Sequence, residues 1–216
     1  LYKIYDSLLS HAAWEKKTRE FEDKSDLVTF VSAITNTVPI LERRRYAYDH
    51  INLPDVVSYL VGQALIANTD HGHKNFYMFR DTVGSGEWTI WPWDVDLSFG
   101  HNWGPNYYND TIWTNNTLNF DKTNPMYNLP FAAPEMIQMY LRRMRTVIDR
   151  WLQPPEQTVD LYFERRFDEV LARIDPPDVG TSDADLDFAR WGTPFTTNSV
   201  PPVVEIPRVK QQYLVG

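Results

Sequence analysis

The feature that most limits the fold of this 216-residue chain is an apolar helical stripe followed directly by two strand-like runs. Residues 54–67 carry apolar side chains at helical spacing behind Pro54, which predicts a wide-faced, buried helix. Residues 75–81 and 87–94 are aromatic and β-branched, and the sequence TVGSG between them is typical of a hairpin turn. A buried helix joined to an antiparallel hairpin predicts the α+β class.

The remainder of the chain is predicted to be mostly helical and to form one domain unit with the hairpin. A helix begins near Ser25, with apolar residues at helical spacing behind it. We expect a long polar loop over residues 100–133 and helical structure over residues 134–175. Residues 176–216 are rich in Pro and Asp and predict an irregular tail with a short final helix.

Composition excludes several classes of function. Lys and Arg number 21 and Asp and Glu number 29, a net charge of −8, which disfavours nucleic acid as a partner. The absence of cysteine excludes a disulfide scaffold, a Cys nucleophile and a thiolate zinc site. The longest apolar stretch, residues 56–67, is shorter than the roughly 20 residues that span a bilayer. Because the chain begins at Leu1 and not at Met, we expect a segment of a larger parent chain.

Four polar residues flank the predicted hairpin. Asp70 follows the buried helix, Asn75 comes five residues later, and Asp94 and Asp96 stand where the second strand ends. Protein kinases place a catalytic Asp, a metal-binding Asn and a second metal-binding Asp in this order around a hairpin. Carboxylate and amide oxygens are the ligands that hard cations such as Mg²⁺ prefer. The order therefore favours metal-dependent phosphoryl transfer.

The register of the hairpin decides whether these side chains meet. If the hairpin turns about its midpoint, Arg80 faces Thr89 and Asn75 faces Asp94. Directly opposed residues have Cβ atoms roughly 4.5–5.5 Å apart, which is close enough for two oxygens to share one Mg²⁺. A shift of one residue would place Asp94 on the opposite face of the sheet.

Five pieces of the sequence resemble one protein family. LYK, EKKT, SDL, ANTDHGHKNFYMFRD and WTIWPWDVDLSFG are similar to the CotH family of spore coat protein H-like atypical protein kinases, most specifically in PWDVDLSFG. The resemblance covers most of the chain and implies a protein-kinase-like C-terminal lobe, with the metal site on the hairpin. It implies that Asp70 is the catalytic base, that Asn75 and Asp94 bind ATP through a metal ion, and that Asp96 is a further metal residue.

The same resemblance implies cofactors, partners and a location. It implies ATP with Mg²⁺ or Mn²⁺, a protein acceptor that offers Ser or Thr hydroxyl groups, and a secreted or cell-surface protein. The N-terminal lobe of such a kinase, with its ATP-positioning Lys, is not recognisable in this sequence, and the resemblance places it before Leu1. The segment by itself therefore is expected to lack the lid over ATP.

Two other functions remain open at this stage. The fold could serve as a non-catalytic coat, surface or adhesion protein, in which the acidic residues have no catalytic role. Alternatively, His71 and His73 form an HxH pair that, with nearby carboxylates, could bind zinc for hydrolysis.

The tryptophans of the central stretch are assigned by their position. Trp91 and Trp93 belong to a predicted strand, so we expect core positions for both. Trp103 and Trp113 belong to the long polar loop, where contact with a sugar or a peptide is the better hypothesis.

Overall fold

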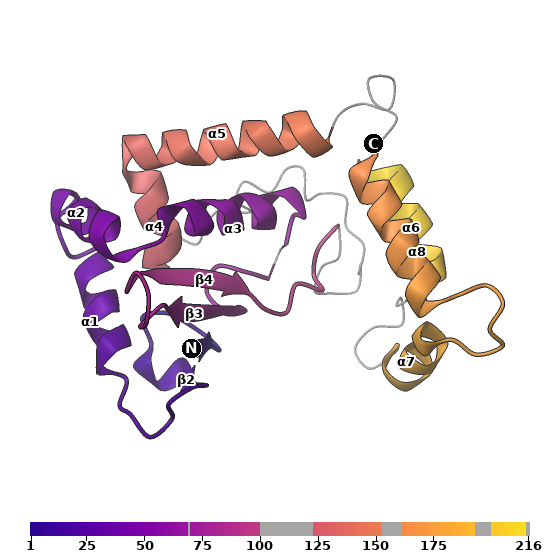
Figure 1. The fold of residues 1–216 in the computed structure, drawn as a ribbon, viewed down its shortest axis with the longest axis horizontal. Coiled ribbons are helices and arrows are strands. Elements are labelled where there is room, and N and C mark those ends of the chain that lie inside the picture. Colours follow the sequence, from indigo (N-terminus) through magenta and orange to yellow (C-terminus); the bar gives the residue numbers. More distant parts are fainter. Residues whose placement is uncertain (69, 100–122, 153–160, 193–199, 215–216) are drawn as a thin grey trace. The chain divides into compact units, whose positions relative to one another are not determined.

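The computed structural model describes residues 1–68, 70–99, 123–152, 161–192 and 200–214, and these form two compact units (Figure 1). Among the described residues, 1–98 and 123–144 belong to the first unit, and 99, 145–152, 161–192 and 200–214 belong to the second. The candidate residues of the hairpin region all belong to the first unit.

A four-stranded antiparallel sheet forms the centre of the first unit. Its strands are β1 (Tyr2–Ile4), β2 (Trp14–Lys16), β3 (Phe76–Arg80) and β4 (Trp88–Pro92), in the order β2-β1-β3-β4. The predicted hairpin is therefore present as β3 and β4, and the N-terminal strands extend the same sheet. Together with the helices described below, the sheet confirms the α+β class.

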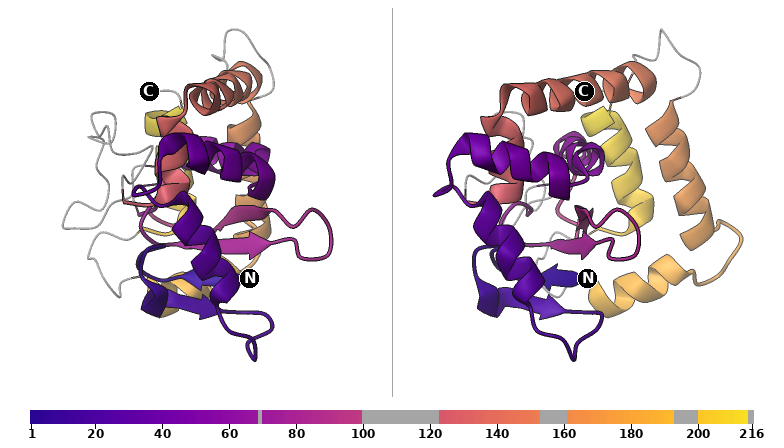
Figure 2. Two further views of the ribbon diagram at one scale, coloured as in Figure 1. Left: turned by 90° about the vertical axis from the view of Figure 1, so that its left-hand side faces the viewer. Right: turned by 60° about the vertical axis from the view of Figure 1, so that its left-hand side comes forward.

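The register of the hairpin differs by one residue from the prediction. Arg80 faces Trp88, and Phe79 faces Thr89. The turn is closed by Asp81, whose backbone exchanges hydrogen bonds with Glu87 and Gly86 and whose carboxylate accepts backbone N–H bonds inside the loop. Gly86 has a φ of +78°, which a glycine adopts at little cost. The observed pairs centre the turn on Gly84, whereas the predicted pairs centred it between Gly84 and Ser85. This loop projects from the sheet in Figure 2.

One face of the sheet is buried against helices. Trp88 is 2 % exposed, and its ring lies 4.9 Å from that of Phe30 in α1 (Ser25–Ile34) and 6.1 Å from that of Tyr2. Helix α3 (Leu53–Leu65) packs on β4, and the backbone N–H of Asn52 donates to the Trp88 carbonyl at 2.9 Å. The other side chains of this buried face come from three strands: Ile4, Phe76, Met78 and Ile90.

The opposite face of the sheet corrects the prediction for two tryptophans. Trp91 is 44 % exposed and Trp93 is 43 % exposed, so neither is a core residue. Side chains alternate between the two faces along a strand, and the observed register places Trp91 opposite Tyr77, away from Trp88. Trp91 stacks on Phe79 with ring centroids 4.7 Å apart, which leaves an aromatic outer face.

Helix α3 positions the polar loop that follows it. The helix begins with Asn52, whose side chain accepts from the Asp55 backbone N–H, and Pro54 lies in its first turn. It ends where Ala67 takes a left-handed φ of +47° and the N–H of Asn68 donates to the Gln63 carbonyl at 3.1 Å. This left-handed C-terminal turn redirects the chain so that residue 70 enters the interior of the first unit.

The first unit is completed by α2 (Ile40–His50), α4 (Pro125–Ala132) and the first part of α5 (Pro134–Trp151). Helix α5 confirms the helix predicted from Pro134. Helix α4 corrects the polar loop predicted over residues 100–133, of which 100–122 lie outside the described residues. Asn124 caps this helix through the Met126 N–H, and Pro125 takes its first position, a start signal hidden in a polar, Asn-rich stretch.

The second unit is mostly helical. It contains α6 (Tyr162–Ile174), α7 (Asp183–Trp191), α8 (Pro202–Arg208) and a π-helical turn (Val209–Leu214). The predicted final helix is confirmed, but the irregular tail predicted for residues 176–216 is wrong because α7 lies within it. Ser182 and Asp185 form a reciprocal capping box, and this local signal outweighs the low helix propensity of the Asp-rich segment. Among the described residues, no helix is long and apolar enough to cross a membrane.

The two faces of β4 generate a prediction of stability. Replacing Trp88 with Ala should lower the free energy of unfolding by about 3–5 kcal/mol, because it empties a buried site between α1 and the sheet. Replacing Trp91 with Ala should cost about 1 kcal/mol, since that ring is half exposed and loses mainly its stacking on Phe79. Urea unfolding of both variants measures the difference, and equal losses would contradict the burial of this strand.

Candidate functional site

Asp70 lies in the loop that follows α3 and is buried. Its backbone N–H donates to Asn68 Oδ1 at 2.9 Å. Its Oδ2 accepts from Asn75 Nδ2 at 2.9 Å and lies 3.3 Å from Lys74 Nζ. Oδ1 of the same carboxylate has no hydrogen bond to any described residue. Within the described part of the chain, the side chain of Asp70 therefore makes its contacts through Oδ2 and not through Oδ1.

Asn75 is held in one orientation by Asp70. Its Nδ2 donates to both the backbone carbonyl and Oδ2 of Asp70, each at 2.9 Å. These two bonds identify the amide nitrogen, so Oδ1 points to the other side, where no described residue contacts it by a hydrogen bond. Asn75 has a φ of +63°, which Asn tolerates better than most residues, and the strand β3 begins directly after it. The Oδ1 of Asn75 is therefore left without a hydrogen bond to the described residues, while its Nδ2 holds the side chain in one orientation.

The loop between Asp70 and Asn75 is fixed from a distant part of the chain. Asn124, which caps α4, also donates its side-chain amide to the Gly72 carbonyl. Gly72 has a φ of +102°, a conformation that favours glycine. Within the loop, Lys74 pairs with the Asp70 carboxylate. The loop is thus anchored by a buried amide that lies 52 residues away in the sequence.

Asp94 and Asp96 form a second pair at the exit of β4. The side chains of the two residues share a hydrogen bond, and Asp94 leaves the strand with a φ of +54°. Burial raises the pKa of the Asp96 carboxyl above its ordinary value of 3.8, and the negative charge of Asp94 raises it further. Two acidic groups in this position repel each other when both are ionised, and a proton or a cation between them relieves the repulsion.

The pair Asp70–Asn75 lies near the pair Asp94–Asp96, but Asn75 and Asp94 are not directly opposite each other as the predicted register required. Asn75 is opposite Trp93, whose N–H donates to the Asn75 carbonyl at 3.2 Å, and not opposite Asp94. Asp94 is the next residue, so its Cα lies within roughly 9 Å of the Asn75 Cα. Both residues have left-handed backbones, so the alternation of strand faces does not govern their side chains. Within the described part of the chain, no three His, Asp or Glu side chains gather around one point.

The donor set of this region fits a hard divalent cation. The available groups are the free Oδ1 of Asn75 and the paired carboxylates of Asp94 and Asp96, all of them oxygen ligands. Burial first, and then the negative charge of Asp94, raise the pKa of the Asp96 carboxyl and so disfavour its ionised form. A bound Mg²⁺ or Mn²⁺ would supply the missing positive charge.

The histidines of the loop are arranged differently from a zinc site. Nδ1 of His71 lies 3.2 Å from the hydroxyl of Tyr127, and the two rings are 5.4 Å apart. This nitrogen therefore already has a partner within the protein. Together with the lack of a three-ligand cluster among the described residues, this leaves the zinc alternative through His71 and His73 without support from the geometry.

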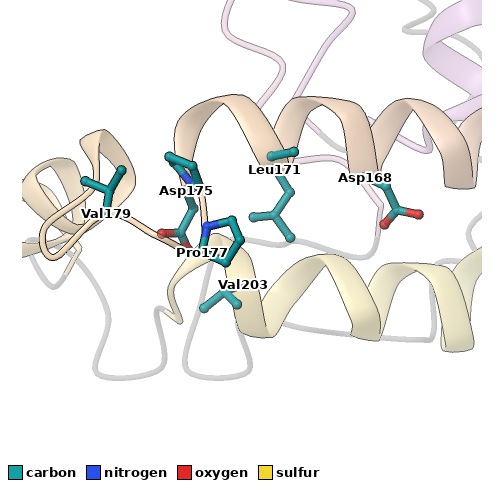
Figure 3. A pocket seen from close by; sticks show the side chains of 8 residues that line it. Asp168, Leu171, Asp175, Pro177, Val179 and Val203 are labelled. Carbon is teal, nitrogen blue, oxygen red and sulfur yellow. The ribbon is translucent and has the colours of Figure 1, made fainter.

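A cavity of about 440 Å³ lies in the second unit, where α6 and its following turn meet α8. Its walls are mainly apolar, and Asp168 at one end pairs with Lys210 (Figure 3). None of the predicted site residues lines this cavity. Trp103 and Trp113, the residues predicted to contact a substrate, lie outside the described residues.

Several residues around Asp70 were missed by the sequence analysis. Asn68 could have been found, because an Asn two residues before an Asp often accepts that residue's backbone N–H. Tyr127 and Asn124 carried no such signal, since both reach the loop only through the packing of α4. Long-range contacts of this kind have no local pattern in sequence.

The pKa of Asp96 generates a prediction for the metal-free chain in a chelating buffer. Because the folded-state pKa is raised, the stabilising contribution of Asp96 is complete below about pH 3.8 and is lost as the pH rises through the folded-state pKa. Asp96→Asn should therefore raise the free energy of unfolding at pH 7, and the gain should disappear below about pH 3.8. Denaturant titrations across this range measure it, with the exposed Asp49→Asn as control. Equal stability of wild type and Asp96→Asn at pH 7 would contradict the coupling.

Comparison with known proteins identifies the family of the chain. No curated protein is significantly similar to the chain. The family of CotH kinase proteins matches residues 6–165, which includes α3, the Asp70 loop, the hairpin and both acidic residues after it. Because the match covers well over half of the sequence, the chain belongs to the CotH kinase protein family.

Proposed function

We propose that this chain supplies the catalytic loop and the metal-binding residues of an atypical protein kinase, which transfers the γ-phosphate of ATP to Ser or Thr hydroxyl groups. The observation that carries the proposal is the pair of hydrogen bonds from Asn75 to Asp70. They leave one oxygen on each side chain without a hydrogen bond to a described residue, as a base and a neighbouring metal ligand require. Membership of the CotH kinase protein family supports the same reaction.

Asp70 acts as the base of the proposed reaction. Its Oδ2 is held by Asn75 and Lys74, so its Oδ1 is the atom that accepts the hydrogen bond and then the proton of the acceptor hydroxyl. Because the carboxylate is buried and its backbone N–H is fixed by Asn68, it meets the hydroxyl in one orientation. Orientation is the larger part of the task, since phosphoryl transfer needs little covalent chemistry from the protein.

Asn75, Asp94 and Asp96 are the proposed metal ligands. Mg²⁺ or Mn²⁺, when bound with ATP, would neutralise charge on the phosphates. Asn75 offers its free amide oxygen, and Asp94 starts from a backbone position close enough for both side chains to reach one cation. Asp96 adds a second carboxylate that its partner Asp94 keeps nearby. The left-handed conformations of Asn75 and Asp94 turn the chain where the ligands are needed.

The acceptor and the location are part of the proposal. The family resemblance supports a protein acceptor and a secreted or cell-surface setting. The negative net charge of −8 agrees with an acceptor that is not nucleic acid.

Transfer of labelled phosphate tests the proposal directly. The protein that contains residues 1–216 is incubated with γ-labelled ATP, Mg²⁺ or Mn²⁺, and a Ser-rich acceptor. We expect incorporation by the wild type and a loss of at least about a hundredfold in Asp70→Asn and in Asp94→Ala, since each removes a group that acts on the reacting atoms. Asp49→Ala, an exposed Asp of α2, is the matched control and should retain full activity.

ATP affinity separates the two roles. Asp94→Ala should weaken metal-dependent ATP binding, whereas Asp70→Asn should leave it close to the wild-type value, because Asp70 contacts the acceptor and not the metal. Folded wild type that neither binds ATP nor incorporates label would reject the kinase and favour a non-catalytic surface or coat protein on the same fold. Zinc at unit stoichiometry in the purified protein would favour the hydrolase instead.

A further inference from the structure

Asn124 is a buried side chain that serves two parts of the first unit at once. It is 1 % exposed, and its Oδ1 accepts the backbone N–H of Met126 at 3.0 Å, which caps α4. Its Nδ2 donates to the backbone carbonyl of Gly72, which lies in the loop between Asp70 and Asn75. A single amide group therefore joins the start of a helix to the candidate catalytic loop.

The two polar atoms of the Asn124 amide are identified by their partners. The backbone N–H of Met126 can only donate, so the atom next to it is the amide oxygen. The carbonyl of Gly72 can only accept, so the atom that faces it is the amide nitrogen. Neither assignment involves a hydroxyl rotor or a histidine tautomer, and a flipped amide would lose both bonds. The direction of each hydrogen bond is therefore fixed by the backbone group at its other end.

Helix α4 gives Asn124 a fixed support. The backbone carbonyl of Asn124 accepts from the N–H groups of Tyr127 at 3.1 Å and Asn128 at 2.9 Å, so main chain and side chain both bind the first turn. Met126 and Leu129 of this helix are each 1 % exposed, and the helix packs against α1, α2 and α3. The position of the Asn124 amide is therefore set by the packing of the core.

The contact on the loop side falls between Asp70 and Asn75. Gly72 is buried and has a φ of +102°. The ends of this short segment are joined to each other, because Asn75 Nδ2 donates to the carbonyl and to Oδ2 of Asp70, each at 2.9 Å. Asn124 holds the middle of the same segment from outside. Without the Asn124 donor, the buried carbonyl of Gly72 loses this hydrogen bond, and its peptide group loses the contact that sets its orientation.

We propose that Asn124 is a positioning residue, which holds the loop between Asp70 and Asn75 at its middle and thereby keeps the Asp70 carboxylate in place for the acceptor hydroxyl. The role in catalysis rests on the proposed function, whereas the coupling of α4 to the loop does not. The helix cap uses the amide oxygen and the loop contact uses the amide nitrogen. A substitution can therefore remove the loop contact and keep the cap.

Two substitutions make this separation. Asn124→Asp keeps the shape of the side chain and an oxygen that caps the helix, but its ionised carboxylate has no N–H for the Gly72 carbonyl. Asn124→Ser also keeps a capping oxygen and removes the amide donor. Asn52→Ser is the matched control, because Asn52 caps α3 in the same way and its side chain bonds to Asp55, away from the loop.

The first test is hydrogen exchange of the Asn75 side-chain amide, followed by NMR in the protein that contains residues 1–216. This amide is bonded to Asp70 inside the loop, and its exchange requires neither ATP nor metal. Both Asn124 variants should raise its exchange rate about tenfold or more relative to the backbone amides of the β3–β4 ladder, because the loop opens locally. Asn52→Ser should leave that ratio unchanged. An unchanged ratio in both Asn124 variants, or an equal increase throughout the ladder, would overturn the proposal.

The second test is the kinetics of phosphate transfer. Asn124→Asp should lower kcat about tenfold with little change in KM for ATP, because a displaced base slows the reaction without removing a metal ligand. Asn52→Ser should keep the wild-type kcat. Faster exchange of the Asn75 amide with an unchanged kcat would reject the catalytic role of Asn124 alone. A wild type that transfers no phosphate would reject the proposed function, and hydrogen exchange would then decide the coupling of α4 to the loop by itself.

Discussion

The hydrogen bonds between Asn75 and Asp70 are the interaction on which the rest of the candidate site depends. They join the loop after α3 to the residue before β3, and so restrict the conformation of the segment between Asp70 and Asn75. The bonds engage Nδ2 of Asn75 and Oδ2 of Asp70. The Oδ1 atoms of both side chains make no hydrogen bond to the described residues. Neither side chain can rotate without breaking a buried hydrogen bond, so each bond restricts the orientation of both residues. This arrangement also depends on how the loop backbone is held.

That support comes from helices on both sides of the loop. The C-terminal turn of α3 presents Asn68 to the Asp70 backbone, and Asn124, the N-cap residue of α4, donates to the Gly72 carbonyl. Tyr127 adds a third attachment one turn into α4. Buried polar groups are costly unless all of them are paired, so these contacts favour a single arrangement of the loop over its alternatives.

The aromatic residues of the sheet are divided between its buried face and its exposed face. Trp88 faces the helices and joins the core, whereas Trp91 and Trp93 form the opposite face together with Tyr77 and Phe79. The ammonium of Lys3 lies 4.4 Å from the ring of Trp93. Composition alone could not predict which rings are buried, because the face that each ring occupies depends on the register of the hairpin. That register is set in the turn by the hydrogen bonds of Asp81 and the left-handed conformation of Gly86.

Sequence patterns were enough to predict the α+β class, the buried helix and the hairpin, because periodicity and local motifs are encoded within short segments. The same patterns single out Asp70, Asn75, Asp94 and Asp96 as candidate residues. Local capping signals could have revealed α4 and α7. Tertiary structure alone decided the one-residue register, the pairing of Asn75 with Asp70, and the approach of Tyr127 and Asn124 to the loop. The reason is physical: these contacts join residues that are adjacent only after the helices pack on the sheet, and burial selects them.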